Sequence, residues 1–328
     1  MNGVLVQRLL TYLSTTECRS VEDIGDELGC SLAEVTRHIE ALPDIGIELD
    51  EVSDRGFVLK EPLELLDKNL IMESLAPAVR AQLRGLNIES SLDSTNSALK
   101  RLPRVAQHAT LILAEHQSGG RGRRGRQWHS PFGRNLYLSL GWMFDRPLTE
   151  LSSLPLVVAL ATAQALSRAG LKGHQVKWPN DLILDGQKLC GCLVEVQGDV
   201  SGPCHAVLGA GINVHMPVSV AGSRIDQPWT DLNSHLPDCS RNGLAVLLIE
   251  ALVEQLGLFA EQGFTPFQGH WQQMDVLNGK RIDVWTANSS FKGIARGVDD
   301  SGALRLDTGK EILSLHSGEA SLRKPAGP

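Results

Sequence analysis

The chain has 328 residues, of which 42% are hydrophobic and 21% are charged, so it can build sizeable cores and is not broadly disordered. At roughly 100–200 residues per domain, this length predicts two or three domains. No run of about 18 consecutive apolar residues occurs, so we expect no membrane span. The short apolar stretch at the N-terminus has neither a basic leader nor a small-residue cleavage site, and we expect it to be a first helix.

Charge and cysteine content narrow the class further. Residues 1–60 carry five basic and twelve acidic side chains, so the formal charge of −7 of the whole chain lies in that segment. Tight DNA binding usually depends on basic residues, and this acidity weighs against it. The six cysteines include no Cys-x-x-Cys pair, which argues against a disulfide scaffold and predicts a cytoplasmic protein with reduced thiols.

The first sixty residues have the pattern of a helix-turn-helix followed by a hairpin. Apolar residues recur with helical spacing over 4–13 and 21–28. Ser31 and Glu34 then form a capping box that begins another helix, which ends before Pro43. Two short strands over 47–52 and 57–59 predict a wing, so residues 1–63 read as a winged helix-turn-helix domain.

The remainder predicts an α+β multidomain protein. Over residues 67–274, strands follow one another by hairpin-length loops as often as they alternate with helices, which favours a central mixed β-sheet. The expected strands are 111–114, 135–140, 182–184, 193–196 and 206–209, and the expected long helices are 154–169 and 244–261. Residues 275–328 show short strands and glycine turns over 280–286, 291–298, 303–307 and 311–315, which predict a small β-barrel.

The most informative segment is 117–128, Gln-Ser-Gly-Gly-Arg-Gly-Arg-Arg-Gly-Arg-Gln-Trp. It contains G-x-G-x-x-G, but a strand follows instead of the helix that would hold a pyrophosphate, so a dinucleotide site is rejected. Four arginines in this loop predict an anionic ligand. The alternatives are a solvated charge run or an RGG-like nucleic-acid segment; we favour the ligand because the run is single, short and followed by Trp128, which can stack on a base.

Two later segments carry further polar chemistry. Lys177-Trp-Pro-Asn-Asp181, followed by Lys188, places a lysine on either side of an Asn-Asp turn, which suits a charged ligand. Taken alone it could equally be a strand-ending turn. In Gly209-Ala-Gly-Ile-Asn213 the small residues allow close approach and the asparagine can bind a polar group, although a bulged strand with a structural asparagine fits that segment as well.

Taken in order, the motifs of this chain resemble those of biotin protein ligases. They are Ser94-Thr95-Asn96, the 119–126 loop with Trp128-His-Ser-Pro131, Lys177–Asp181, Lys188-Leu-Cys-Gly191 and Gly209–Asn213. With the N-terminal helix-turn-helix and the C-terminal barrel, the chain resembles the bifunctional biotin ligase and biotin-operon repressor (BirA) family over nearly its full length. The resemblance implies a class II synthetase-like catalytic domain over 67–274 and an SH3-like C-terminal barrel over 275–328.

The resemblance also implies an activity and a set of site residues. Such enzymes join biotin and ATP to form biotinoyl-5′-AMP, with Mg²⁺ arriving on the nucleotide and no visible protein metal site, and pass biotin to a lysine of biotin carboxyl carrier protein. The implied catalytic residues are Arg121, Arg123, Asp181 and Lys188. The implied biotin ligands are Ser94, Thr95, Asn96, Gln117, Arg121, Gly122, Arg123 and Lys188. The implied ATP or adenylate ligands are Arg124, Arg126, Trp128, Lys177, Asn180, Asn213 and Arg323.

A repressor role would place the helix that begins at Ser31 in a DNA major groove, as an adenylate-bound homodimer on operator DNA. The implied DNA contacts are Ser31, Thr36, Arg37 and His38. Two alternatives stay open: a monofunctional ligase whose acidic N-terminal domain no longer binds an operator, and a sensor that binds biotinoyl-AMP without transferring it.

Overall fold

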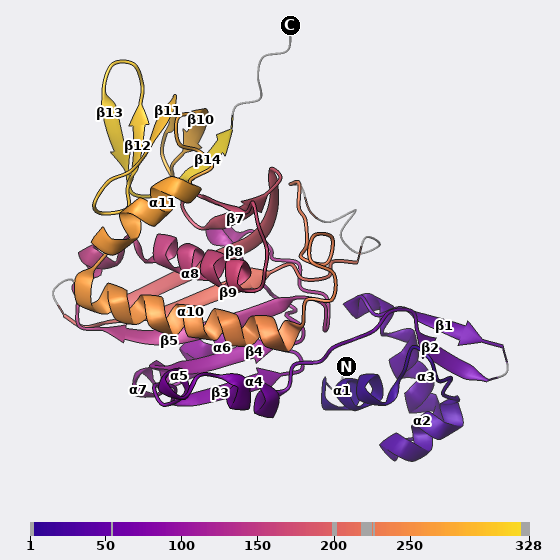
Figure 1. Ribbon diagram of the computed structural model, residues 1–328. Helices are drawn as coiled ribbons and strands as arrows, with labels where there is room; N and C mark the ends of the chain where they lie inside the picture. Colours follow the sequence, from indigo (N-terminus) through magenta and orange to yellow (C-terminus); the bar gives the residue numbers. More distant parts are fainter. Residues whose placement is uncertain (1–2, 54, 199–201, 218–224, 226, 323–328) are drawn as a thin grey trace, which may run out of the picture.

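The computed structural model describes residues 3–53, 55–198, 202–217, 225 and 227–322, which form an N-terminal helical unit, a central sheet and a C-terminal sheet (Figure 1). In the N-terminal unit three helices pack around one apolar cluster beside a two-stranded antiparallel hairpin. Its elements are α1 (Gly3–Tyr12), α2 (Val21–Leu28), α3 (Leu32–Glu40), η1 (Pro43–Ile45), β1 (Leu49–Val52) and β2 (Gly56–Leu59).

Local sequence signals explain where these helices begin and end. The hydroxyl of Ser20 accepts a hydrogen bond from the Asp23 N–H at 3.0 Å and caps α2. Gly29 ends that helix in the left-handed region at φ 66°. The predicted capping box of α3 is confirmed, because the Glu34 carboxylate accepts the Ser31 N–H at 3.0 Å.

The central sheet has seven strands in the order β3-β4-β5-β9-β8-β7-β6, and only β3 and β4 are parallel. The predicted mixed sheet is therefore confirmed, with β5, β8 and β9 longer than expected. Its strands are β3 (Gly85–Glu89), β4 (Thr110–Ala114), β5 (Leu136–Phe144), β6 (Gln175–Lys177), β7 (Asp181–Leu184), β8 (Gln187–Gly198) and β9 (Cys204–Ile212).

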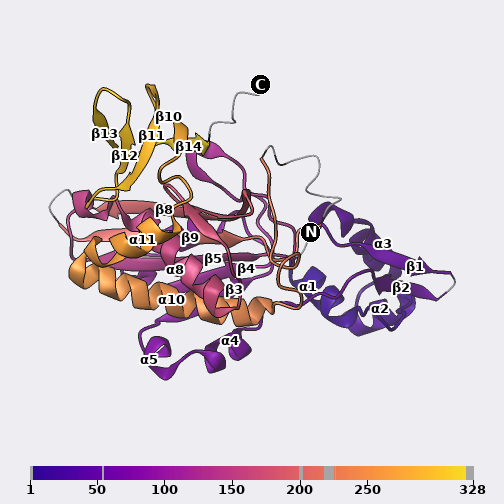
Figure 2. The same cartoon turned by 45° about the horizontal axis from the view of Figure 1, so that its top comes forward.

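The two faces of this sheet differ in what covers them (Figures 1 and 2). On one face the long helices α8 (Leu154–Arg168) and α10 (Arg241–Gln262) lie side by side and complete the main core. On the other face α6 (Thr95–Arg101) packs on β4, β5 and β9, where Leu99, Ile112 and Val207 form a small separate cluster. The face that carries α6 is the one that presents polar residues and glycines.

Two segments, Leu148–Arg168 and Arg241–Gln262, are long and apolar enough to cross a membrane by length and composition alone. They contain α8 and α10, and 67% and 56% of their most apolar windows are buried inside the protein. The apolar character of both helices is thus accounted for by packing on the sheet and on each other.

The C-terminal part forms a five-stranded antiparallel sheet in the order β13-β12-β11-β10-β14. Its buried residues belong to the same apolar cluster as the central sheet, and the Trp178 indole N–H donates to the Gly302 carbonyl at 3.2 Å across the junction. The sequence predicted four of these strands and missed β14. The strands are β10 (Arg281–Trp285), β11 (Ser290–Val298), β12 (Leu304–Asp307), β13 (Ile312–Leu315) and β14 (Glu319–Leu322).

Short helices complete the central part of the chain and its connections. They are α4 (Lys68–Ser74), α5 (Pro77–Arg80), α7 (Arg104–Gln107), η2 (Arg123–Gly125), η3 (Leu148–Leu151), η4 (Thr265–Phe267) and α11 (Gln268–Met274).

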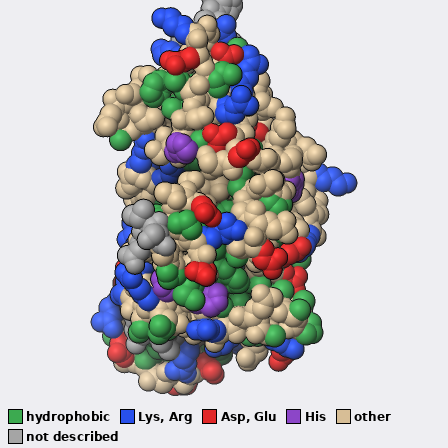
Figure 3. All heavy atoms as spheres, turned by 90° about the vertical axis from the view of Figure 1, so that its left-hand side faces the viewer, with side chains coloured by type: hydrophobic (Ala, Val, Ile, Leu, Met, Phe, Trp, Pro, Cys, Tyr) green, Lys and Arg blue, Asp and Glu red, His purple; other side chains and the backbone are tan. Residues whose placement is uncertain are grey.

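On the face shown in Figure 3, acidic and basic side chains are intermixed and neither sign forms a continuous field. This is expected where the two signs balance, as they do after residue 60.

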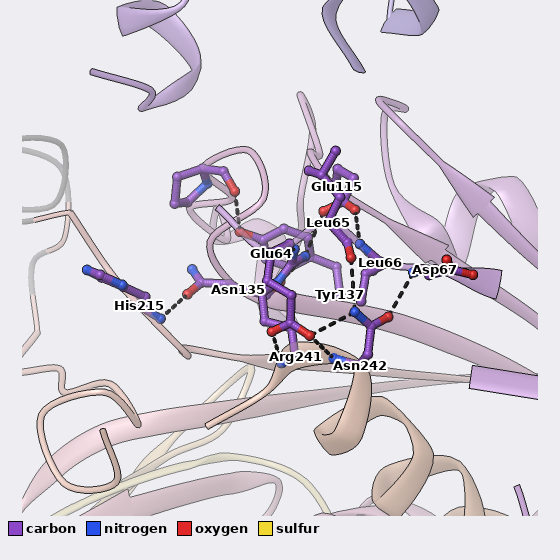
Figure 4. A network of polar contacts seen from close by, with 11 residues as sticks. Glu64, Leu65, Leu66, Asp67, Glu115, Asn135, Tyr137, His215, Arg241 and Asn242 are labelled. Carbon is purple, nitrogen blue, oxygen red and sulfur yellow. Dashed lines mark hydrogen bonds and ion pairs between the residues drawn. The ribbon is translucent and has the colours of Figure 1, made fainter. Parts of the chain in front are cut away.

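The segment that joins the N-terminal unit to the central sheet is held by a buried polar network (Figure 4). The Arg241 guanidinium lies 2.7 Å from the Glu115 carboxylate, and both side chains are at least 96% buried. Arg241 also donates to the Asn135 carbonyl at 2.8 Å and to the Glu64 carbonyl. The Glu115 carboxylate in turn accepts the Leu66 N–H at 2.5 Å. The linker is therefore fixed to the start of β5 and to the residue from which the arginine-rich loop departs.

Candidate active site

The arginine-rich segment 117–128 is a narrow hairpin above the polar face of the sheet. Its base is held by the Gly119 N–H, which donates to the Asp93 carbonyl at 2.8 Å, and its arms by the Trp128 N–H, which donates to the Gly120 carbonyl at 2.9 Å. Its tip is η2, where Arg124 has φ 56°. A Cβ at Gly120 would lie 2.6 Å from the Trp128 carbonyl oxygen, so the close approach of the two arms requires glycine there.

The loop places the Trp128 indole on a floor made by two glycines of adjacent strands. Gly191 of β8 pairs with Gly211 of β9. A Cβ at Gly211 would meet the indole ring at 2.7 Å, and one at Gly191 at 3.0 Å. The Lys188 ammonium lies 5.5 Å from the ring centroid, within cation–π range. The small residues noted in the sequence therefore admit a flat group onto the sheet.

Cations gather at the end of this floor around one carboxylate. The Lys188 Nζ lies 2.9 Å from the Asp181 Oδ1, with both side chains mostly buried. The Arg123 guanidinium reaches the Asn180 side-chain oxygen at 3.4 Å. Burial lowers the pKa values of Arg123 and Lys177, and the Asp181 carboxylate opposes both shifts. The structure brings Arg123, Lys177, Asn180, Asp181 and Lys188 together. Three cations share one carboxylate, an arrangement that favours an added anion.

A second group of predicted residues forms a hydrogen-bonded network on the same face of the sheet, two residues further along the strands. The Gln117 side-chain oxygen accepts the Thr95 N–H at 2.9 Å. The Ser139 hydroxyl lies 2.7 Å from the Thr95 Oγ1 and 2.6 Å from the Asn96 Oδ1. Ser94, at the start of α6, is also buried. Ser139 was missed from the sequence; its only signal is a serine within the apolar run of β5.

Sheet register sets the distance between the two groups. Gly211 and Gly191 lie in one row with Asp181, and Gly209 lies two residues away in the row that holds Ser139. At about 3.3 Å per residue, the rows are about 7 Å apart. The site can therefore hold one ligand with a polar head at the Thr95 end and an anionic group at the Lys188 end.

Several loop residues that were predicted to contact a ligand make other contacts in the structure. Arg124 donates to the Trp285 carbonyl at 3.0 Å and Arg126 pairs with Glu319 at 2.5 Å, so both arginines extend to the C-terminal sheet. Arg121 is exposed and donates to the Ser97 hydroxyl at 2.6 Å. Gly122 lies in the loop arm, where its N–H donates to the Arg126 carbonyl at 2.7 Å.

The two asparagines predicted as ATP or adenylate ligands already use their amide N–H groups within the protein. Asn213 donates to the Thr230 carbonyl at 3.0 Å, and Asn180 donates to the Cys192 carbonyl. Both are buried, and both support strands that carry the cations. Arg323 lies outside the described residues.

One of the residues predicted to contact DNA, His38, is buried in the structure. His38 is 8% exposed and lies on the buried side of α3, because that helix presents Val35, His38 and Ile39 inward. Ser31, Thr36 and Arg37 are exposed, as expected of residues available to a partner.

Within the described ranges, no group of three or more His, Cys, Asp or Glu side chains could hold a metal ion. The carboxylate at the cation cluster is Asp181, which already pairs with Lys188. Such a donor set does not build a resident metal centre, but it fits Mg²⁺ delivered by a nucleotide and held by few protein ligands.

Comparison with known proteins agrees with this geometry. The family model "Biotin/lipoate A/B protein ligase family" matches residues 89–213, and "Biotin protein ligase C terminal domain" matches residues 279–323. A solved structure of the Aquifex aeolicus biotin protein ligase in complex with biotin and ATP covers 74% of this chain and 100% of its own, with a TM-score of 0.61 and 25% identity. Fold and site thus define a protein of the biotin/lipoate ligase class.

The curated relatives extend the match to the N-terminal unit. "Bifunctional ligase/repressor BirA" of Escherichia coli (strain K12) is 36% identical over 318 residues, which cover 96% of each chain. The protein with the same description in Bacillus subtilis (strain 168) is 30% identical over 98% of this chain and 100% of its own. The chain belongs to the BirA family of bifunctional ligase/repressor proteins.

Proposed function

We propose that this chain is a biotin–[biotin carboxyl carrier protein] ligase, which condenses biotin with ATP to biotinoyl-5′-AMP and pyrophosphate and then transfers biotin to a carrier-protein lysine. The observation that carries the proposal is the spacing of the two groups along the sheet. The network around Thr95, Gln117 and Ser139 suits the polar ureido head of biotin, and the cations around Lys188 lie where its carboxylate would end.

The cation cluster meets the electrostatic demand of the first step. A carboxylate and a triphosphate repel each other, and negative charge grows on the α-phosphate as the carboxylate oxygen attacks it. Arg123 and Lys188 would neutralise that charge, and Lys188 is already oriented by Asp181. This step requires no covalent nucleophile from the protein; the residues named here would position two substrates and stabilise charge. The 117–128 loop would shield the mixed anhydride from water.

Mg²⁺ would enter on the nucleotide in this scheme. Asp181 is the carboxylate we assign to contact it, after Lys188 has turned to the new anions. The ion supplies charge neutralisation of the phosphates when bound.

A direct assay tests the ligase proposal. Purified full-length protein, Mg-ATP and biotin should biotinylate a biotin carboxyl carrier protein at its lysine, detected by mass spectrometry, and should release pyrophosphate in proportion. Adenylate formation without transfer to the carrier would instead support the sensor alternative.

For the N-terminal unit we propose a winged helix-turn-helix in which α3 is the recognition helix and β1–β2 the wing. Ser31, Thr36 and Arg37 are the exposed candidates on α3, and the wing follows it directly. Because the segment is acidic overall, specificity would depend on few base contacts. A gel shift with DNA from upstream of biotin-synthesis genes, with and without biotin and ATP, distinguishes a repressor from a ligase that has lost operator binding.

We further propose that the adenylate-bound protein dimerises through the central sheet, and that the C-terminal sheet is an SH3-like barrel over 275–328. On the β7 side, β8 is paired only from Gln187 to Gly191, so among the described strands its continuation to Gly198 has an unpaired edge. Such an edge can add a strand from a second copy or from a carrier protein. Analytical ultracentrifugation with and without biotinoyl-AMP tests the dimer.

A further inference from the structure

A half-buried glutamate that the proposed chemistry does not use lies at the far end of the polar network. Glu195 is on β8, and its side chain reaches the face that carries α6. Its Oε2 accepts a hydrogen bond from the Asn96 amide at 2.8 Å, and its Oε1 pairs with the Lys100 ammonium at 2.6 Å. Burial alone would raise the pKa of Glu195, but the hydrogen bonds from Lys100 and Asn96 hold this pKa below its ordinary value. The carboxylate is therefore ionised at neutral pH and can only accept hydrogen bonds.

The sheet fixes the Asn96 amide between Glu195 and Ser139. Ser139 of β5 pairs with Gly209 of β9, which pairs with Leu193 of β8. The amide lies flat over Gly209, where a Cβ would come within 2.4 Å of the Asn96 oxygen. Its nitrogen faces β8 and donates to the Leu193 carbonyl at 3.2 Å as well as to Glu195, while its oxygen faces Ser139 at 2.6 Å.

Donor counts and contact lengths together give the short hydrogen bonds of this network a direction. The Asn96 oxygen cannot donate, so the single Ser139 hydroxyl hydrogen goes to it. The Thr95 hydroxyl hydrogen then has two acceptors within reach, the Ser139 oxygen at 2.7 Å and the Gln117 side-chain oxygen at 3.2 Å, and we assign it to the shorter contact. With its hydrogen used, the Thr95 oxygen has only lone pairs for a ligand. The Gln117 oxygen beside it, at 3.2 Å, is also an acceptor and already takes the Thr95 N–H.

We infer that Glu195 is a positioning residue which, through Asn96 and Ser139, fixes the Thr95 hydroxyl as an acceptor for an N–H group of the bound head group. The inference rests on the proposed function, because a biotin ureido ring supplies such an N–H donor. Glu195 does not touch the ligand in this scheme. It sets which hydrogen-bonding pattern the head-group end of the site accepts, and so contributes to selectivity for ureido ligands.

The test uses biotin binding to the full-length protein, measured by calorimetry without ATP, together with steady-state kinetics. Glu195→Gln keeps the shape but lets the side chain donate or accept, so the Asn96 amide is less firmly oriented. We expect the Kd and KM for biotin to rise about tenfold, as for loss of one charge-assisted hydrogen bond, with kcat and the KM for ATP unchanged. Lys100→Met is the matched control, because it removes the ion pair and leaves the carboxylate acceptor; we expect less than about a threefold change.

A second variant tests the path of the effect. Ser139→Ala interrupts the relay in the middle, and we expect a loss similar to that of Glu195→Gln, with the double variant no weaker than the larger single loss. Circular dichroism confirms that each variant is folded. Unchanged biotin affinity in Glu195→Gln, or losses that multiply to about a hundredfold in the double variant, would overturn the inference. If the wild-type protein fails to bind biotin, the proposed function itself is wrong.

Discussion

Replacing Arg241 with methionine removes the cation from the network that fixes the linker, while keeping an unbranched chain of similar length. The guanidinium contacts the Glu115 carboxylate at 2.7 Å and the Asn135 carbonyl at 2.8 Å. Glu115 is fully buried, and among the described residues its carboxylate would keep the Leu66 N–H as its hydrogen-bond donor. An uncompensated buried charge of this kind costs about 3–5 kcal/mol. We therefore expect the free energy of unfolding to fall by about that amount.

Urea denaturation followed by tryptophan fluorescence measures this loss. Arg168→Met is the control: that arginine pairs with Glu254 at 2.8 Å on the surface, with side chains 36% and 53% exposed, and such pairs contribute about 0–1 kcal/mol. Combining Arg241→Met with Glu115→Gln should recover part of the stability, because the unpaired buried carboxylate of Glu115 is then removed. If Arg241→Met lost no more than Arg168→Met, the buried pair would not fix the linker as argued.

Three further predictions concern the site and the C-terminal junction. Lys188→Met should slow adenylate formation about 10²–10³-fold in a pyrophosphate-release assay, as for loss of one charge-stabilising group, whereas the exposed Lys172→Met should not. Gly211→Ala should slow the same step at least about tenfold, because the new methyl group would meet the indole at 2.7 Å; Gly257→Ala, which meets nothing within 4 Å, should have no effect. Burial raises the pKa of Asp275 from 3.8 to about 6, so the folded state holds this proton more tightly and loses stability as pH rises from about 4 to 6. Asp275→Asn should accordingly raise the free energy of unfolding at pH 7.5 by at most about 3 kcal/mol, measured as a higher Tm, and leave the Tm nearly unchanged at pH 4; equal Tm shifts at both pH values would contradict this reasoning.

The sequence located the elements well where one local signal was strong. The capping box at Ser31 and the long apolar periodicity of α8 and α10 both appear as expected. β14 was missed because four residues after a glycine turn are too short to show alternation, and it becomes a strand by pairing with β10. The burial of His38 could not be predicted from the sequence, because packing within the N-terminal unit decides which side of α3 is buried.

Site residues could likewise be predicted where the local sequence signal was strong, and were missed where their place depends on tertiary structure. The loop arginines and Lys188 could be identified from the sequence by their charge. The structure brings Arg123 and Lys188 to the same end of the floor formed by Gly191 and Gly211. Ser139 and Glu195 gave no such signal, because one polar residue in an apolar strand does not reveal which face it occupies. Their roles depend on the register of β5, β9 and β8, which joins residues far apart in the sequence.

Phe132, which follows the arginine-rich loop, makes the N-terminal unit hard to separate from the rest. Its ring is 1% exposed within the apolar cluster of α1, α2 and α3, and its N–H donates to the Ile45 carbonyl at 2.8 Å. Cutting the chain after residue 63 would leave a bare phenyl group in water a few residues from Trp128. A shortened enzyme would then have a disturbed loop as well as a missing domain, so its activity would understate that of the catalytic part.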